Sequence, residues 1–147
     1  PLFLQKRLGQ NLKSFVLIKF RTMPIETKTV GTHLTKDIEL TTYGYFLRKT
    51  KLDEIPQLLN VFFGDMSLVG PRPPLAEEVN QYEKSETRRL LVKPGLTGLW
   101  QVSGRSELDW EDAVRLDLYY VENWSLTLDI LIIIRTAAAV WRGEGAY

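Results

Sequence analysis

The chain contains no cysteine and one histidine, His33, among its 147 residues. The lack of cysteine excludes disulfide bonds, thiolate metal sites and a cysteine nucleophile. His33 lies in a threonine-rich, loop-like stretch, and we expect it to be a solvated surface residue, because metal sites usually cluster several ligands. The cysteine count does not reveal the compartment, although a reducing cytosol is compatible with it.

The chain also lacks a large excess of charge of either sign, since 19 basic and 18 acidic residues leave a net charge of +1. This balance argues against a nucleic-acid-binding protein that works by bulk electrostatics. With 44% hydrophobic and 25% charged residues, the composition is that of a globular protein, and we expect residues 1–147 to form one domain. The chain opens on Pro1 with neither an initiator methionine nor a signal peptide, so we expect it to be a fragment whose N-terminal part is missing.

A long hydrophobic run is missing as well. Asp129 and Arg135 flank the apolar stretch Ile130–Ile134, which is too short to span a bilayer. We expect a helix over about 126–141 whose polar residues occupy an arc of roughly 140°. The apolar remainder fits either a core helix or a helix in a membrane interface, where Trp141 would lie at the headgroup level.

The patterning predicts an α+β fold, a mostly helical single domain with an N-terminal β-hairpin and a C-terminal amphipathic helix at the membrane interface. Phe3–Arg7 and Phe15–Phe20, separated by Gly9-Gln10-Asn11, predict the hairpin. Three prolines restrict φ over residues 70–74 and predict an extended connector there. Further expected elements are helices over 42–49, 76–91 and about 108–123, and a short strand over 99–102.

Two adjacent carboxylates, Asp53 and Glu54, stand just before Pro56. Because proline is tolerated in a first helical turn but not in a helix interior, a helix should begin between Thr50 and Asp53, with both carboxylates at its N-terminal end. There the helix dipole keeps Asp53 ionised and attracts phosphate or a metal-bound anion. An ionised carboxylate in such a place can act as a nucleophile in phosphoryl transfer. The alternative is that one of the two carboxylates only caps the helix.

The apolar residues around this pair recur at three- and four-residue spacing, which predicts one buried helix face. They are Leu52, Ile55, Leu58, Leu59 and Phe62.

A further carboxylate, Asp117, falls in the middle of an apolar face of the helix expected over about 108–123. A carboxylate in an apolar stripe is costly unless it is paired or used. Two interpretations therefore remain open, a functional carboxylate and a salt bridge to an internal arginine. The apolar face carries Trp110, Val114, Leu118 and Val121.

Several longer segments follow one another along the chain. They are Lys19-Phe20-Arg21-Thr22-Met23, Leu52-Asp53-Glu54-Ile55-Pro56-Gln57-Leu58, Gly64-Asp65-Met66-Ser67-Leu68-Val69-Gly70-Pro71-Arg72-Pro73, Lys93-Pro94-Gly95-Leu96-Thr97-Gly98 and Asp117-Leu118-Tyr119-Tyr120-Val121. Together they closely resemble the bacterial sugar transferase family, the monotopic phosphoglycosyl transferases that start capsule, exopolysaccharide and O-antigen synthesis. The resemblance covers nearly the whole chain, and its specificity comes from the order of the segments rather than from any one of them.

The resemblance implies an enzyme that moves a sugar-1-phosphate from a UDP-sugar to polyprenyl (undecaprenyl) phosphate and releases UMP. It implies that Asp53 is the nucleophile of a covalent phosphosugar–enzyme intermediate and that Glu54 is its catalytic neighbour. It also implies Mg²⁺, which suits a pair of hard carboxylate oxygens bridging to a diphosphate, so Asp53 and Glu54 are the expected ligands.

Such chemistry needs cations, because negative phosphates must meet a negative nucleophile. Arg72 stands between prolines that hold its backbone rigid, which suits a bidentate phosphate clamp. Each arginine of the family pattern could instead form a structural ion pair. The resemblance assigns further substrate-binding roles to Arg21, Arg48, Arg89, Asp117, Gln101 and Arg105.

Family members carry a hydrophobic re-entrant helix before the hairpin, a segment that these 147 residues do not include. The resemblance places the catalytic domain at the cytoplasmic face of the bacterial cell membrane, with the lipid surface as a partner and a possible homo-oligomer, whereas this chain alone is expected to be peripheral or soluble. Two other functions stay open. The chain could be a non-catalytic, membrane-peripheral scaffold, or a metal-dependent phosphohydrolase that uses the same Asp–Glu pair.

Overall fold

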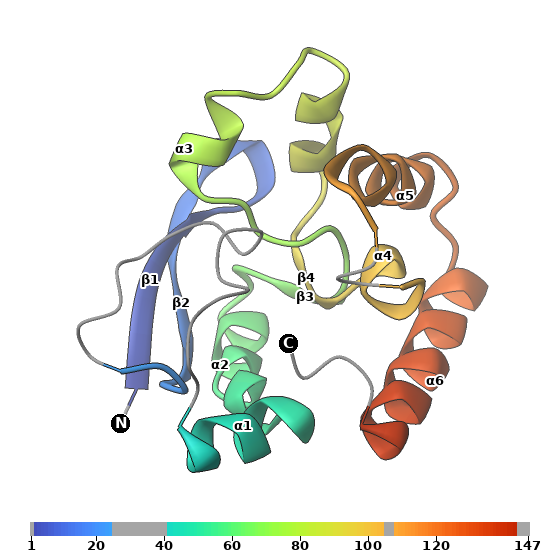
Figure 1. Cartoon of the computed structure of the whole chain (residues 1–147). Helices are drawn as coiled ribbons and strands as arrows, with labels where there is room; N and C mark the ends of the chain where they lie inside the picture. The colour runs from blue at the N-terminus through green and yellow to red at the C-terminus, as the bar shows by residue number, and fades with distance from the viewer. Residues whose placement is uncertain (1, 25–40, 105–107, 144–147) are drawn as a thin grey trace.

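A β-hairpin forms one side of the molecule and confirms the prediction for the N-terminal residues (Figure 1). The structure is a computed structural model that describes residues 2–24, 41–104 and 108–143. Strand β1 (Leu2–Leu8) pairs antiparallel with β2 (Ser14–Phe20), with Leu2 opposite Phe20. A 3₁₀ turn, η1 (Gln10–Leu12), connects the two strands.

Two short helices lie near the lower end of the hairpin in Figure 1. Helix α1 (Thr42–Lys49) has the predicted range, and it begins where the Thr41 hydroxyl accepts a hydrogen bond from the Gly44 N–H at 2.9 Å. A Cβ at Gly44 would lie 2.1 Å from the Thr22 carbonyl oxygen, so glycine lets α1 approach the end of β2. The next elements are a 3₁₀ turn, η3 (Leu52–Glu54), and helix α2 (Gln57–Phe62).

A small parallel sheet lies at the centre of the molecule. Strand β3 (Ser67–Val69) pairs with β4 (Gly95–Thr97), and Ser67 lies opposite Gly95. Helix α4 (Leu99–Val102) follows β4 directly, so the strand predicted over 99–102 is wrong. The ladder with β3 is made by residues 95–97, and Leu99 is instead buried in the core.

The charged helix predicted over 76–91 is also wrong, because the segment forms two separate helical pieces. These are α3 (Ala76–Val79) and a 3₁₀ helix, η4 (Glu86–Leu91). Each piece has its own start, since Glu78 accepts a hydrogen bond from the Leu75 N–H and Glu86 accepts one from the Glu83 N–H. The segment has few apolar residues at helical spacing, so these local polar contacts determine its path.

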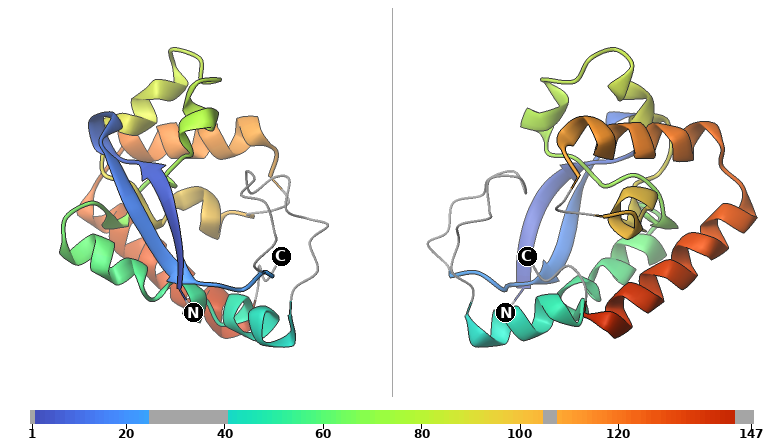
Figure 2. Two further views of the ribbon diagram at one scale, coloured as in Figure 1. Left: turned by 90° about the vertical axis from the view of Figure 1, so that its left-hand side faces the viewer. Right: turned by 45° about the vertical axis from the view of Figure 1, so that its right-hand side comes forward.

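The last two helices complete an α+β fold that is mostly helical, as predicted. Helix α5 (Trp110–Glu122) begins at Asp109, whose side chain accepts a hydrogen bond from the Asp112 N–H, and α6 (Leu126–Arg142) closely matches the predicted range. Figure 2 shows α6 running along the edge of the molecule with α1 and α2 in the same half. The core here is formed by Val69, Leu99, Tyr120 and Ile132.

The predicted buried face of the helix around Asp53 is wrong, because its apolar residues point outward. The exposed fraction ranges from 37% for Leu52 to 83% for Phe62. Polar Gln57 and Asn60 take the inner side, where the Asn60 side chain accepts a hydrogen bond from the Ile18 N–H and donates one to the Val16 carbonyl. These bonds attach α2 to the unpaired edge of β2, so polar pairing takes the place of apolar packing.

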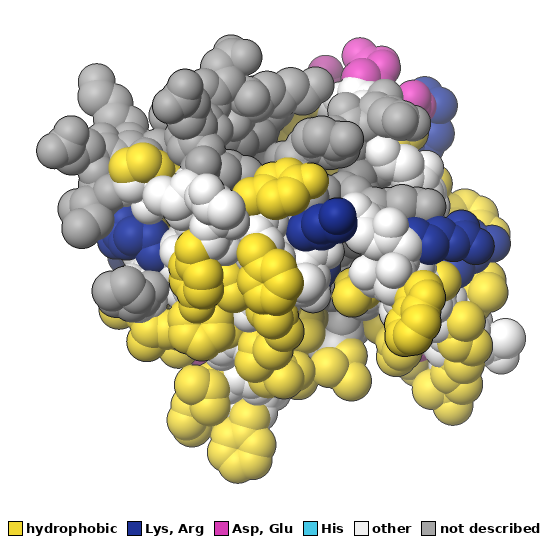
Figure 3. Space-filling view, turned by 60° about the horizontal axis from the view of Figure 1, so that its bottom comes forward, with side chains coloured by type: hydrophobic (Ala, Val, Ile, Leu, Met, Phe, Trp, Pro, Cys, Tyr) yellow, Lys and Arg dark blue, Asp and Glu magenta, His cyan; other side chains and the backbone are white. Residues whose placement is uncertain are grey.

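The outward residues belong to a larger hydrophobic surface, which we call the apolar face (Figure 3). Hydrophobic side chains gather on the end of the molecule that carries α1, with lysine and arginine side chains between them. In the described parts of the chain, no helix has the length and apolar character needed to cross a bilayer. The apolar face consists of Tyr43, Tyr45, Phe46, Ile55, Leu58, Leu59, Phe62, Phe63, Ile130, Leu131, Ile133, Ile134 and Trp141, each more than 40% exposed.

Candidate active site

Asp53 is a buried carboxylate in the 3₁₀ turn that precedes α2. Lys51 turns the chain into it with a left-handed conformation (φ 59°), and Asp53 itself is 6% exposed. Its Oδ1 atom accepts no hydrogen bond from the described residues, although it is fully buried. A buried oxygen without a donor is costly, and this oxygen therefore has capacity for a ligand.

The predicted helix start is confirmed in part. Helical structure begins at Leu52, within the predicted window, but α2 proper begins only after Pro56. Asp53 and Glu54 therefore lie in a separate turn, one step before α2. Since no N–H of the described residues donates to Oδ1 of Asp53, that oxygen does not act as a helix cap.

The electrostatic surroundings favour a proton on Asp53. Burial raises its pKa from 3.8 to about 6, and the neighbouring Glu54 raises the pKa further, while Lys51, Lys19 and Arg48 oppose the shift. The carboxylate is thus a stronger base than an exposed aspartate and still mostly ionised at neutral pH.

Lys19 and Arg48 bring positive charge to the pair from two other elements. Burial, followed by repulsion from Arg48 and Arg7, lowers the pKa of Lys19 to about 8, while Asp53 and Glu54 act in the opposite direction. Burial is also the main cause that lowers the pKa of Arg48, whose Nε donates to the Thr22 hydroxyl at 3.0 Å. Two carboxylates and two cations thus meet at the junction of β2, α1 and η3.

Lys19 was not among the residues predicted for the site, although it belongs to the same segment as Arg21. The signal was the spacing, because Lys19 near the end of β2 and Arg21 just beyond it are two residues apart, and extended backbone turns such residues to one face. Both cations lie over the ring of Phe3, at 5.2 Å from its centroid. Arg21 is thus near Lys19. Among the described residues, Arg21 shows no contact with Asp53 or Glu54.

Arg72 lies in the connector between β3 and α3. Its charge interacts with Glu54 of the carboxylate pair and also with Glu78 and Arg89. Burial is the largest cause that lowers the pKa of Arg72; Glu78 and Glu54 raise it, and Arg89 lowers it. The connector passes close to β4, since the Gly95 N–H donates to the Pro71 carbonyl at 2.9 Å. A Cβ at Gly95 would lie 2.0 Å from the Gly70 nitrogen, so glycine is required there.

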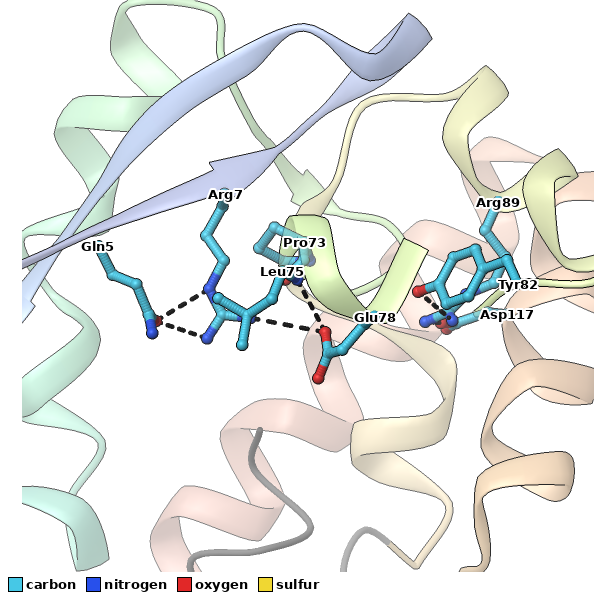
Figure 4. Close-up of polar contacts among 8 residues, drawn as sticks. All are labelled: Gln5, Arg7, Pro73, Leu75, Glu78, Tyr82, Arg89 and Asp117. Atoms are coloured by element: carbon cyan, nitrogen blue, oxygen red, sulfur yellow. Dashed lines mark hydrogen bonds and ion pairs between the residues drawn. The ribbon is translucent and has the colours of Figure 1, made fainter. Parts of the chain in front are cut away.

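Arg89 and Asp117 form a buried ion pair, which is the salt bridge that the sequence analysis left open (Figure 4). Arg89 Nη2 lies 2.5 Å from Asp117 Oδ2, and Arg89 Nη1 donates to the Tyr82 hydroxyl at 2.9 Å. The guanidinium also lies 5.4 Å from the ring centroids of Tyr82 and Trp110. Burial raises the pKa of Asp117 to about 6 against the charge and hydrogen bond of Arg89. The pair therefore joins η4 to α5.

Two predicted site residues remain. Gln101 is half-buried in α4, and Arg105 belongs to the residues that are not described. His33 is also outside the described residues. Within the described ranges no three acidic or histidine side chains gather as a ready metal site.

Comparison with known proteins finds one family along almost the whole chain. The profile described as "Bacterial sugar transferase" matches residues 1–143. The uncharacterized sugar transferase EpsL of Bacillus subtilis (strain 168) is 46% identical over 143 residues, covering 97% of this chain and 71% of that protein.

Two other relatives carry names that state a reaction. The undecaprenyl-phosphate galactose phosphotransferase of Salmonella typhimurium is 43% identical over 159 residues, which cover 97% of this chain and 33% of that protein. The UDP-glucose:undecaprenyl-phosphate glucose-1-phosphate transferase of Xanthomonas campestris pv. campestris is 40% identical over 156 residues, covering 99% of this chain and 32% of that protein. The chain thus spans about a third of the length of these two relatives.

Proposed function

The chain belongs to the bacterial sugar transferase family, and from this premise we propose that it transfers a sugar-1-phosphate from a UDP-sugar to polyprenyl (undecaprenyl) phosphate and releases UMP. The observation that carries the proposal is the environment of the Asp53 side chain. This side chain is a buried carboxylate, one of its oxygens accepts no hydrogen bond from the described residues, and three cations, Lys51, Lys19 and Arg48, act on it.

In the first step an oxygen of the ionised Asp53 attacks the β-phosphorus of the UDP-sugar. A bond forms between this oxygen and phosphorus, and the bond between phosphorus and the oxygen bridging to the α-phosphate breaks. UMP leaves with the bonding electron pair, and the sugar-phosphate remains on Asp53 as an acyl phosphate. A pKa of about 6 supports this role, because at neutral pH the carboxylate is mainly ionised and more basic than an ordinary aspartate.

In the second step a phosphate oxygen of the polyprenyl phosphate attacks the same phosphorus. The bond from phosphorus to Asp53 breaks, the carboxylate is regenerated, and the sugar is left on a lipid diphosphate. The covalent intermediate thus replaces a direct attack of one phosphate on the other by two separate displacements at the same phosphorus. No proton has to be removed from the attacking group in either step, since both nucleophiles are already anionic.

Lys19, Arg48 and Arg72 are proposed to bind the diphosphate. The pKa of each is lowered mainly by burial, which means that folding removes water from these charged groups. Such cations are compensated when an anion binds, and they neutralise the charge that repels a carboxylate nucleophile. For Arg21, Arg89, Asp117, Gln101 and Arg105 a substrate-binding role remains a proposal from the family resemblance.

Mg²⁺ fits the donor set of Asp53 and Glu54. Its usual protein ligands in phosphate chemistry are one or two carboxylates, the other positions being taken by phosphates and water. The buried Oδ1 of Asp53, which accepts no hydrogen bond within the described part of the chain, is the observation that supports a cation here. When bound, Mg²⁺ would neutralise charge on the diphosphate.

The apolar face supports a lipid surface as the place of reaction. Large exposed hydrophobic patches mark interaction sites, and aromatic and cationic side chains such as Trp141 and the exposed Arg135 suit the headgroup region. We therefore propose that α1, α2 and α6 lie on the cytoplasmic membrane face.

Replacing Phe62 and Phe63 by serine is expected to lower partitioning onto vesicles of phosphatidylglycerol and phosphatidylethanolamine by roughly tenfold or more, because two exposed aromatic rings lose their place in the lipid. Vesicle sedimentation measures this. Leu12→Ser is the matched control, since Leu12 is 56% exposed in the hairpin turn at the opposite end of the molecule. Equal partitioning of both variants would remove α2 from the lipid-facing surface.

The transfer itself is tested by intact-protein mass spectrometry after incubation with magnesium and a panel of UDP-sugars, with UMP measured in parallel. We expect the mass of one sugar-phosphate on the wild-type chain and none on Asp53→Asn. The half-reaction needs no lipid acceptor, and when each UDP-sugar is incubated separately, the donor that gives the adduct identifies the sugar.

The other outcomes distinguish the alternatives. UMP and free sugar-phosphate accumulating without a lipid acceptor would indicate a phosphohydrolase. A folded chain that neither reacts with nor binds any UDP-sugar in the presence of magnesium would indicate a scaffold.

A further inference from the structure

The connector that carries Arg72 is held by groups that the proposed chemistry does not use. The Gly70 N–H at its start donates to the Thr97 carbonyl at 2.9 Å. Its prolines have no N–H group, so beyond Gly70 this backbone can be fixed only through its carbonyls and the Arg72 N–H. The Pro71 carbonyl accepts a hydrogen bond from the Gly95 N–H at 2.9 Å, and the Pro74 carbonyl accepts one from the Leu8 N–H at 3.0 Å. Between these two anchors stands a third, which is a side chain.

Arg7 provides this third anchor. Its Nη1 donates to the Pro73 carbonyl at 3.0 Å, and only 5% of the residue is exposed. The other edge of the guanidinium is fixed as well, because Nε and Nη2 donate to Oε1 of Gln5 at 2.9 and 2.6 Å (Figure 4). Gln5 lies two residues earlier on β1 and therefore on the same face.

Glu78 completes the arrangement from the other end of the connector. Its Oε2 accepts a hydrogen bond from the Leu75 N–H at 2.8 Å and lies 3.9 Å from Nη1 of Arg7. Arg7 thus holds the connector at Pro73 and, through Glu78, at the start of α3. The residue next to the anchored carbonyl is Arg72.

This arrangement has an electrostatic cost. Burial, and then the charge of Arg72, lower the pKa of Arg7 to about 10. A neutral amide could hold one carbonyl without that repulsion. A guanidinium instead supplies donors on two edges in one rigid plane, and so it can fix the carbonyl and the Gln5 side chain together.

We propose that Arg7 is a positioning residue for the phosphate clamp: by holding the Pro73 carbonyl it determines the direction in which the Arg72 side chain leaves the connector. What Arg72 binds rests on the proposed function, whereas the anchoring does not. A clamp that is already oriented loses less conformational entropy on binding a diphosphate.

The test compares Arg7→Lys with Lys6→Met, a change at the exposed neighbouring position on the same strand. Lysine keeps the charge but cannot bond Gln5 and Pro73 together. We expect amide hydrogen exchange of the 66–75 peptide to become about tenfold faster in Arg7→Lys, with α6 unchanged, and no change in Lys6→Met. Gln5→Leu, which frees the guanidinium and keeps Arg7, should act in the same direction.

Kinetics then connect the anchor to Arg72. We expect Arg7→Lys to lower kcat/KM for the UDP-sugar about tenfold relative to wild type. In the Arg72→Ala background, adding Arg7→Lys should lower kcat/KM by less than twofold relative to Arg72→Ala alone, because the two residues act as one unit. Unchanged exchange in the connector, or a full tenfold loss in the Arg72→Ala background, would overturn the inference. Faster exchange in a chain whose wild type binds no UDP-sugar would instead refute the proposed function and support the anchoring.

Discussion

Asp53→Asn is expected to slow UMP release from the UDP-sugar by roughly 1,000-fold or more, because the amide cannot form the acyl phosphate. The measurement is UMP production under saturating UDP-sugar and magnesium. Glu77→Gln, which removes an exposed carboxylate on α3, is the control and should keep full activity. Turnover of Asp53→Asn within tenfold of wild type would refute the nucleophile assignment.

The same substitution is expected to stabilise the fold in magnesium-free buffer near pH 7.5. The pKa of Asp53 is raised in the folded state, so folding favours its protonated form, and the ionised carboxylate opposes folding. This destabilisation is absent below pH 3.8, the ordinary pKa of aspartate, and reaches its full size above about pH 6, the pKa of Asp53 in the folded protein. The difference between these two pKa values corresponds to at most about 3 kcal/mol.

Thermal unfolding at two pH values measures this effect. Asp53→Asn should unfold at a higher temperature than the wild type near pH 7.5, and the difference should shrink as the pH falls through this range. Magnesium should raise the unfolding temperature of the wild type but not that of Asp53→Asn. A variant that is less stable than the wild type at pH 7.5 would show that Asp53 has a stabilising partner when ionised.

Arg72→Ala is expected to lower kcat/KM for the UDP-sugar by about 100-fold or more, since the clamp makes charge-assisted hydrogen bonds in a desolvated place. Arg72→Lys should recover only part of this loss, because an ammonium keeps the charge without the planar fork. Steady-state kinetics with a varied UDP-sugar concentration measure both.

Arg88→Ala is the matched control for the arginine substitutions. Arg88 is an exposed arginine on η4 whose partner is Glu122, and exposed ion pairs contribute little to stability. Its removal should leave kcat/KM within twofold of wild type. If Arg72→Ala behaved in the same way, Arg72 would not belong to the site.

Local patterns predicted the elements whose stability is local. The hairpin was predicted from the strand-like segments on either side of Gly9-Gln10-Asn11, and the helix predicted over 42–49 has the bounds of α1, where the Thr41 side chain caps its start. The carboxylate pair and the connector before α3 could also be located from proline chemistry, because proline restricts the backbone whatever surrounds it.

Patterns of spacing failed where another part of the chain decides which side is inside. The apolar stripe that includes Leu58 and Phe62 is at helical spacing, yet it faces outward, because Asn60 bonds the edge of β2 and turns the polar side of α2 inward. Spacing along a helix shows that two faces differ, but it does not show which face meets the rest of the protein.

The sequence by itself determined the chemistry that this protein carries: a paired carboxylate before a proline, an arginine between prolines, and an order of segments that places the chain in its family. The tertiary structure decided which charges meet. It brings Lys19 near Asp53, pairs Arg89 with Asp117, and holds the Arg72 connector with Arg7. The reason is physical: burial strengthens interactions between charges from distant parts of the chain, and only the folded backbone determines which groups are buried together.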